Sequence, residues 1–274
     1  MGTALRPYQA VFRARFNLLL QYRAAAFAGF VTQCWWGAIK VMVLTAFYRG
    51  AVDPPMTLRQ AIDYIWLAQA LLTLIPWSVD PDVARMVRSG DVGYERLRPL
   101  DTYVFWYARA VARRTATPLL RAIPMVLTAG VLLPLSGAPE WALSRPAGLT
   151  AGVLFALSLV FVVALAAAVA VLMEITTVAA LSERGVNMIV GGVIIVLSGN
   201  LVPLPLLPDQ FQLFLRLQPF AGLMDTPLRI YSGHLAGPDA LFALARQTFW
   251  VIVLAAVGRA AMTRVMARLQ AQGG

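Results

Sequence analysis

Residues 147–173 read AGLTAGVLFALSLVFVVALAAAVAVLM and contain no charged side chain. An α-helix needs about 20 mainly apolar residues to cross the hydrocarbon core of a bilayer, and this stretch is longer than that. The strands of a membrane barrel would show hydrophobic and polar residues in alternation over about ten residues, a pattern that the chain lacks. The stretch therefore predicts a transmembrane helix in an integral membrane protein.

The composition of the whole chain supports the same class. Of its 274 residues, 59% are hydrophobic and 13% are charged, whereas soluble domains carry roughly 25% charged residues. The mean hydropathy of +0.70 excludes a disordered chain, and the single cysteine excludes a disulfide scaffold. The net charge of +10 comes almost entirely from arginine. In a membrane protein such residues flank the cytoplasmic ends of spans, so nucleic acid is not an expected partner.

Six stretches are long and apolar enough to cross a membrane as helices. We therefore predict an all-α, polytopic membrane protein in which residues 24–274 form a single domain of six transmembrane helices. An even number of spans places both termini on one side of the membrane. The six stretches are residues 24–47, 61–79, 115–135, 147–173, 186–207 and 240–262.

The distribution of arginine predicts on which side of the membrane the two termini lie, because cytoplasmic loops carry an excess of Lys and Arg. With both termini inside, the inner segments carry fifteen arginines: Arg6, Arg13, Arg15, Arg23, Arg85, Arg88, Arg96, Arg98, Arg109, Arg113, Arg114, Arg184, Arg259, Arg264 and Arg268. The outer segments carry six: Arg49, Arg59, Arg145, Arg216, Arg229 and Arg246. Both termini are therefore expected in the cytoplasm.

Residues 1–23 lack the compact apolar core and small residues of a cleavable signal. At helical spacing, their polar and apolar side chains fall on different faces. The polar face has Arg6, Gln9, Arg13, Asn17 and Gln21, and the apolar face has Leu5, Tyr8, Phe12, Phe16 and Leu19. We predict an amphipathic helix in the cytoplasmic interface, which serves either as a plain anchor or as a functional contact.

The largest cytoplasmic insert, residues 80–101, separates the second and third predicted spans. Asp82 is a suitable N-cap for a helix, and Gly90 is a suitable stop. Charges of both signs alternate along the insert, which favours a protein–protein contact surface. A solvated loop is the alternative interpretation.

The outer connections are short except after the fifth predicted span, where residues 203–235 follow. Pro203, Pro205 and Pro208 end the span because proline cannot continue a helix. Residues 209–218 then mix large apolar side chains with glutamine and arginine, and they are too few and too polar to cross. We predict an interfacial or re-entrant outer helix there.

The chain offers few groups for chemistry of its own. A phosphate-binding loop needs a lysine, and the only lysine, Lys40, lies inside the first predicted span. His234 and Cys34 are the only residues of their types, which gives neither a metal cluster nor a nucleophile–histidine arrangement. We expect no catalytic residue and no metal ligand.

Polar and ionisable groups inside the membrane are functional candidates by default. Lys40, Arg121 and Glu174 lie near the ends of predicted spans, where they either anchor the helix at the interface or contact a substrate. Uncharged polar groups either line a substrate path or form hydrogen bonds between helices. The candidates for such a path are Gln33, Trp36, Gln69, Ser198 and Asn200.

Four segments carry a resemblance to a known family. They are RSGDVGYERLRPLD (residues 88–101), LSGNLVPLPLLPD (197–209), LQPFA (217–221) and PLRIYSG (227–233). Together they resemble the ABC-2 family of ATP-binding-cassette transporter permeases. More narrowly, the chain looks like a six-span subfamily first catalogued as a domain of unknown function and linked to viologen and drug export.

The resemblance implies a non-catalytic permease subunit without a cofactor of its own, in the bacterial plasma (inner) membrane. It implies a homo- or heterodimer of permeases that works with two copies of an ABC ATPase subunit, which holds the ATP and Mg. In such permeases a helix between spans two and three docks on the ATPase. The matching positions here are Asp82, Arg85, Arg88, Asp91, Glu95, Arg96 and Arg98.

The resemblance also implies a substrate path between the two permeases, near spans one, two and five. The expected substrate is a small hydrophobic or cationic drug-like molecule that is exported, with a lipid or a glycan as alternatives. A stand-alone secondary transporter or a membrane-embedded enzyme remains the second hypothesis. A proton-coupled transporter would favour an acidic residue near the middle of the membrane, and none is placed there.

Overall fold

The computed structural model describes residues 2–268, with side chains from residue 5 onward. It is 81% helix, and the described residues contain no strand, which confirms the all-helical prediction. Four helical segments are long and apolar enough to cross a membrane. They are α2 (Arg23–Tyr48), α5 (Thr102–Leu127) with its continuation through a π-helical turn (Thr128–Leu132) into α6 (Leu133–Leu135), α7 (Leu149–Ala180) and α12 (Gly237–Arg268).

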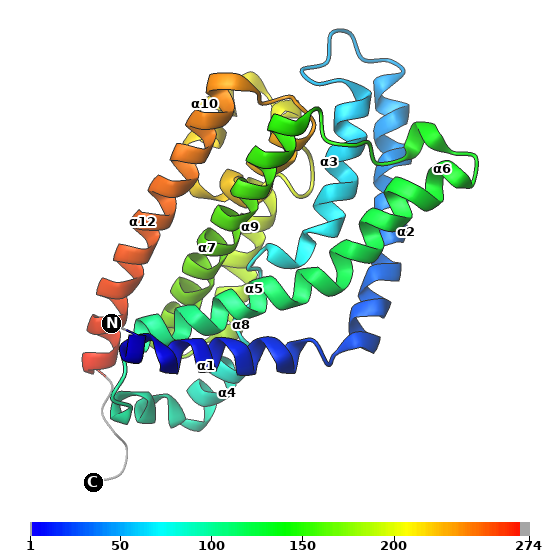
Figure 1. Cartoon of the computed structure of the whole chain (residues 1–274). Coiled ribbons are helices and arrows are strands. Elements are labelled where there is room, and N and C mark those ends of the chain that lie inside the picture. Colours follow the sequence, from blue (N-terminus) through cyan, green and yellow to red (C-terminus); the bar gives the residue numbers. More distant parts are fainter. Residues whose placement is uncertain (1, 269–274) are drawn as a thin grey trace.

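Helix α1 (Gly2–Leu19) lies across one end of the bundle, and α2 rises from it at a steep angle (Figure 1). The start of α1 and the end of α12 lie at this same end (Figure 1). The chain turns between the two helices at residues 20–22. An amphipathic helix that lies across the transmembrane helices is the arrangement expected of an interfacial segment.

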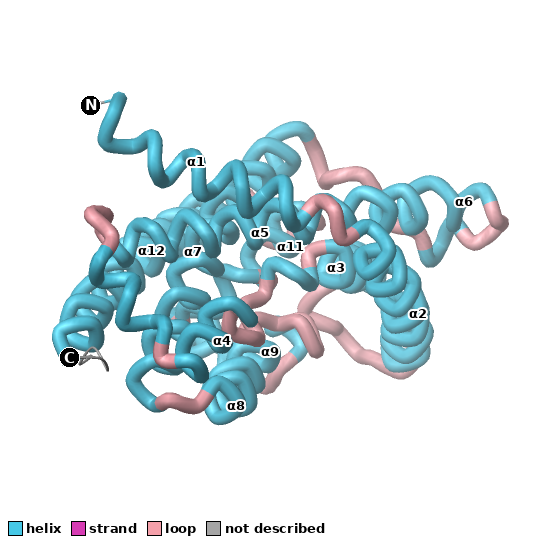
Figure 2. The backbone as a smooth tube through the Cα atoms, turned by 90° about the horizontal axis from the view of Figure 1, so that it is seen from below, coloured by secondary structure: helices cyan, strands magenta, loops and turns pink. Residues whose placement is uncertain are grey.

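The core is built around α7, which lies between α5 and α12 when the molecule is viewed from the α1 end (Figure 2). All seven residues from Leu165 to Val171 are buried. Ala166, Ala167 and Ala168 are fully enclosed, and their small side chains allow neighbouring helices to approach closely, as is common between membrane helices.

Helix α3 (Leu58–Ala70) begins at a capping box, in which Thr57 accepts from the amide of Gln60 and the Gln60 side chain accepts from the amide of Thr57. Every residue from Ala61 to Ala70 is buried. A 3-10 turn (Leu72–Leu74) follows, and Ile75 is then extended, because the residue before a proline is disfavoured in the helical region. The prediction of one continuous helix over residues 61–79 is therefore wrong in its second half.

The non-helical stretch after α3 has its backbone groups satisfied by neighbouring helices. The guanidinium of Arg114 in α5 donates to the carbonyls of Thr73 and Ile75 at 3.1 and 3.2 Å. The amide of Val79 donates to the Asn187 side chain at 2.9 Å. Irregular backbone at membrane depth is tolerated when it is buried in protein and hydrogen-bonded, and this stretch meets both conditions.

The fifth predicted span is also interrupted. Its helical part is α8 (Glu183–Val186), a π-helical turn (Asn187–Gly191) and α9 (Gly192–Leu197). The helix ends before Gly199, whose φ of 83° belongs to the left-handed region, and the chain continues through a 3-10 turn (Leu204–Leu206). The prediction of a helix over residues 186–207 is therefore wrong beyond Leu197.

Short elements complete the two ends of the bundle. At the α1 end these are α4 (Pro81–Ser89) and a 3-10 segment (Asp91–Leu97). At the opposite end these are a 3-10 turn (Pro139–Trp141), α10 (Asp209–Leu217), a 3-10 segment (Pro219–Leu223) and α11 (Asp225–Tyr231). Helix α10 coincides with the helix predicted over residues 209–218, and α4 with the helix predicted to stop at Gly90.

Candidate functional site

The candidate site is α4 with the 3-10 segment that follows it, at the α1 end of the molecule (Figure 1). The N-cap of α4 is Asp80, whose carboxylate accepts from the amide of Asp82 at 2.9 Å. The prediction of Asp82 as the cap is wrong, because Pro81 is pre-set for the first helical position and places the cap one residue before it. Gly90 ends α4 in the left-handed conformation, as predicted.

Asp80 is almost fully buried and is held by arginines from two other helices. Arg15 of α1 donates to both of its carboxylate oxygens, at 2.8 and 2.9 Å, and Arg113 of α5 lies 3.8 Å away. Burial by itself would raise the pKa of Asp80, but Arg15 and Arg113 outweigh it and hold the pKa below the ordinary value. The carboxylate therefore stays ionised and links α1, α4 and α5.

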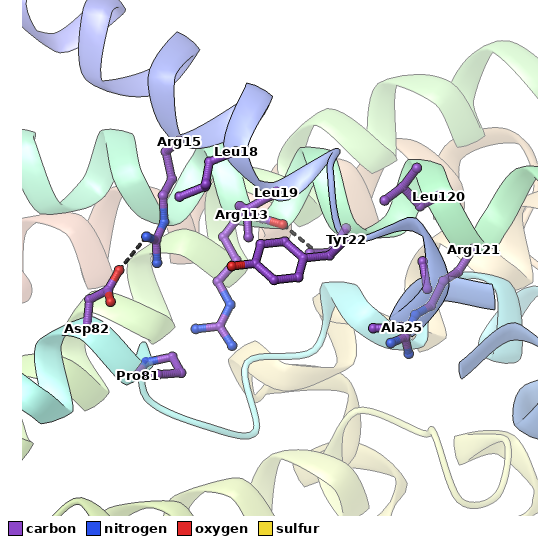
Figure 3. Close-up of a pocket in the computed structure, with 12 residues that line it drawn as sticks. Arg15, Leu18, Leu19, Tyr22, Ala25, Pro81, Asp82, Arg113, Leu120 and Arg121 are labelled. Atoms are coloured by element: carbon purple, nitrogen blue, oxygen red, sulfur yellow. Dashed lines mark hydrogen bonds and ion pairs between the residues drawn. The ribbon is translucent and has the colours of Figure 1, made fainter. Parts of the chain in front are cut away.

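Asp82, in the first turn of α4, joins the same cluster. It forms ion pairs with Arg15 and Arg85, and Arg109 of α5 lies 3.7 Å from it. Figure 3 shows the contact of Arg15 with Asp82 between α1 and the beginning of α4. The first turn of α4 is thus fixed to two helices that are distant in sequence.

The last turn of α4 is fixed to a third helix. Arg88 donates to Glu183, at the beginning of α8, at 2.5 Å. Helix α4 is therefore anchored at both of its ends, to α1 and α5 at one end and to α8 at the other.

The 3-10 segment that follows α4 (Asp91–Leu97) is partly buried. Glu95 is only 4% exposed, accepts from the Trp106 indole at 3.2 Å and pairs with Arg98 at 3.2 Å. Arg98 also lies over the Phe105 ring, 4.7 Å from its centroid. Asp91 accepts from the hydroxyl of Ser89 at 2.6 Å.

The residues predicted to contact an ATPase therefore fall into two groups, those that are exposed and those that contact other parts of the chain. Arg96 is exposed, and the side chains of Arg85 and Arg88 are 68% and 67% exposed. Glu95 and Asp82 serve instead in contacts within the chain. The structure adds two outward apolar side chains that the charge pattern did not indicate, Tyr94 and Leu97, which are 64% and 77% exposed.

The residues predicted for a substrate path are mostly enclosed. Gln33, Gln69, Ser198 and Asn200 are buried, and only Trp36 is open, at 54% exposure. Within the described residues no hydrogen bond joins any two of the five. The side-chain amide of Gln33 has no hydrogen-bond partner within the described residues. The backbone carbonyl of Asn200 accepts from the Lys40 ammonium at 2.8 Å. Lys40 thus reaches the loop that follows α9.

A buried polar network at the end of the molecule opposite α1 was not predicted from the sequence. Asp225 accepts from Tyr64 at 3.3 Å and from Arg229 at 3.0 Å. Arg229 also donates to Nδ1 of His234 at 3.0 Å, and Nε2 of His234 lies 2.9 Å from the carbonyl of Pro55. The LRIY motif that carries Arg229 was visible in the sequence, but its partners were not. The described residues contain no group of three or more His, Cys, Asp and Glu that could hold a metal ion.

Comparison with known proteins places this architecture in a family. Residues 57–273 match the family model described as ABC-2 family transporter protein, a span that includes α4 and everything after it and excludes α1 and α2. No curated protein and no solved structure matches the chain. Members of the family are membrane components of ABC transporters, are generally non-catalytic and normally work with an ABC ATPase partner. Because the match covers most of the chain, this multi-pass membrane protein belongs to the ABC-2 transporter family.

Proposed function

We propose that the chain is the permease subunit of an ABC exporter, which moves a small hydrophobic or cationic drug-like molecule, or a lipid or glycan, out of the cytoplasm. ATP and Mg are bound by a separate ATPase subunit. The six crossings are α2, α3 with residues 71–79, α5 with α6, α7, α8 and α9 with residues 198–207, and α12. The two interrupted crossings are supported by the burial of α3 and by the contacts of Arg114 and Asn187.

The observation that carries this proposal is the anchoring of α4. A coupling helix must bind the ATPase on one face and transmit force to the transmembrane helices on the other. Arg85, Tyr94 and Leu97 face outward, whereas Asp80 and Asp82 hold the helix against α1 and α5. We propose that the outward set, with Arg88, Arg96 and Arg98, forms the ATPase contact.

Transport follows from the rigidity of this connection. Closure of the ATPase pair on ATP displaces α4, and the ion pairs from Asp82 to Arg109 and from Arg88 to Glu183 carry the displacement to α5 and α8. The two permeases then exchange inward- and outward-open states. ATP has to favour one of these states over the other, since a ligand with equal affinity for both shifts nothing.

We propose a pair of permeases with two ATPase copies. The outward face of α2 supports a path between the two permeases, since it leaves Phe27, Val31, Trp35 and Trp36 open over several turns. Aromatic side chains of this kind suit an apolar or cationic substrate.

The decisive experiment is reconstitution with a candidate ABC ATPase subunit from the same organism. We expect the chain alone to hydrolyse no ATP and to show no gradient-driven transport. The complex should hydrolyse ATP and use it to transport the substrate. Arg85→Glu combined with Leu97→Asp should abolish substrate-stimulated ATP hydrolysis and transport, whereas Arg264→Glu, an exposed site on α12, should leave both unchanged. Full stimulation in the double variant would refute docking on α4, and gradient-driven transport by the chain alone would favour a secondary transporter.

The topology has its own test. In a Cys34→Ser background, Ser136→Cys should react with a membrane-impermeant maleimide added to intact spheroplasts, and Ser89→Cys should react only after lysis. Both serines are exposed, at opposite ends of the bundle. The reverse pattern would place the termini outside.

A further inference from the structure

A cavity of about 390 Å³ lies where α1, the first turn of α2, the start of α4 and α5 meet. This volume falls within the range of small-molecule sites. Apolar side chains line one part, among them Leu18, Leu19 and Leu120. Figure 3 shows the guanidinium groups of Arg15, Arg113 and Arg121 spaced along the same cavity.

Arg121 stands out among these cations, because within the described residues it has no hydrogen bond and no ion pair. Its guanidinium lies against Gly29 of α2, so closely that a Cβ at that glycine would come within 2.4 Å of the Arg121 Cζ. Any larger residue would displace the arginine. The backbone of α2 therefore leaves room for a cation that has no ion-pair partner among the described residues.

The surrounding charge also lacks balance. Five arginines, Arg15, Arg85, Arg109, Arg113 and Arg121, face two aspartates, Asp80 and Asp82. An excess of three positive charges remains in a partly enclosed site, which favours an anionic ligand.

The position of the cavity identifies the kind of anion. Gly29 lies six residues into α2, about 9 Å above its first residue at 1.5 Å per residue, so Arg121 sits at the depth where headgroups meet acyl chains. Leucines beside arginines at that depth match a phosphate attached to acyl chains. A free phosphate would make no use of the leucines.

We propose that this cavity binds the headgroup phosphate of an anionic phospholipid from the inner leaflet, with Arg121 and Arg113 on the phosphate and the acyl chains along Leu18, Leu19 and Leu120. The bound lipid joins α1 and α2 to α5 and completes the arginine cluster that holds α4. The inference requires only that the chain is inserted in a membrane and does not depend on what it transports.

The test uses the purified full chain and native mass spectrometry, with phosphatidylglycerol and phosphatidylcholine as the added lipids. We expect the wild type to retain phosphatidylglycerol in preference to phosphatidylcholine. Arg121→Gln should weaken phosphatidylglycerol binding about tenfold, the effect of losing a charged hydrogen bond. Arg264→Gln, which removes the same charge from an exposed site on α12, should bind like the wild type.

A second variant keeps the proposal testable if Arg121→Gln fails to fold. Thr117 lines the cavity, and Thr117→Leu would fill it without removing a charge, so it should also lose phosphatidylglycerol. Equal binding of the two lipids, or full binding by both cavity variants, would overturn the proposal. Displacement of the lipid by millimolar inorganic phosphate would assign the site to free phosphate and would overturn it too.

Discussion

Arg15 of α1 and Asp80 at the start of α4 form an ion pair with an N–O distance of 2.8 Å, although 65 residues separate them. The pair connects a helix that precedes the first transmembrane segment to the proposed coupling helix. It lies against α5, whose Arg113 is 3.8 Å from the same carboxylate. The interfacial helix is thereby part of the support of α4.

Removal of Arg15 should loosen this support. Arg15→Gln leaves the buried Asp80 with the amide of Asp82 and the more distant Arg113, and we expect a loss of about 1–3 kcal/mol in the free energy of unfolding. The pKa of Asp80 should rise as well, because burial is then opposed by less positive charge. Arg13→Gln, on the exposed face of the same helix, is the control. Equal thermal unfolding midpoints for the two variants in detergent would show that the pair contributes no stability.

The role of Arg88 can be separated into its contact with Glu183 and its contact with a partner. Arg88→Glu should reduce coupling between ATP hydrolysis and transport. Combining it with Glu183→Arg restores an ion pair between α4 and α8 with the charges exchanged. If Arg88 acts only by holding α4, the double variant recovers coupled transport; if it also contacts the ATPase, as we propose, the double variant stays uncoupled. Transport per ATP hydrolysed is the measurement.

Two adjacent glycines should respond in opposite ways to alanine. A Cβ at Gly191 would lie 2.4 Å from the carbonyl oxygen of Trp77, which is backbone and cannot move aside, whereas a Cβ at Gly192 meets nothing within 4 Å. Gly191→Ala should destabilise the chain by about 1–3 kcal/mol. Gly192→Ala should be neutral or slightly stabilising, since alanine favours a helix more than glycine does. Thermal unfolding of both variants is the measurement, and similar midpoints would contradict the packing of the π-helical turn (Asn187–Gly191) against Trp77.

Acid should weaken the outer network through His234. Its Nδ1 accepts from Arg229, so the imidazole is neutral with the proton on Nε2, which donates to Pro55. Burial first, and then the charge of Arg229, lowers the pKa of His234 from its ordinary value of 6.5. The unfolded chain therefore binds a proton at a higher pH than the folded chain does. The stabilisation is complete above pH 6.5 and is lost as the pH falls toward the lowered value.

Because the imidazole is only half-buried, we expect that loss to be less than about 1 kcal/mol. The unfolding midpoint, measured between pH 7.5 and pH 5, should fall more for the wild type than for His234→Gln, whose side chain does not titrate. Parallel pH profiles for the two proteins would mean that His234 does not contribute to the acid sensitivity.

Hydropathy was sufficient to predict the position of a helix wherever that helix faces lipid along its length. The predicted range 24–47 agrees with α2 to within one residue at each end, and the range 240–262 lies inside α12, because such helices need an unbroken apolar stretch. The same rule failed for residues 71–79 and 198–207. At residues 71–79, Arg114 and Asn187 supply hydrogen bonds that a lipid cannot, and at residues 198–207 Tyr64 and Lys40 donate to the carbonyls of Gly199 and Asn200.

The charge pattern of residues 80–101 located the candidate site but did not assign its members. Alternating signs suggested one outward surface, whereas Glu95 is buried against Trp106 and Asp82 pairs with Arg15 and Arg109. The exposure of Tyr94 and Leu97 could not be expected, since apolar residues in a polar segment ordinarily turn inward. Local sequence does not indicate which side chains a distant helix will neutralise.

The sequence by itself determined that this chain is a helical membrane protein with a mixed-charge segment between α3 and α5, because hydropathy and capping act over a few neighbouring residues. Only the tertiary structure decided that α4 is held at one end by α1 and α5 and at the other by α8. It also decided that Arg121 lies beside Gly29 and has no ion-pair partner within residues 5–268. The physical reason is that an ion pair or a close approach depends on where residues far apart in the chain meet.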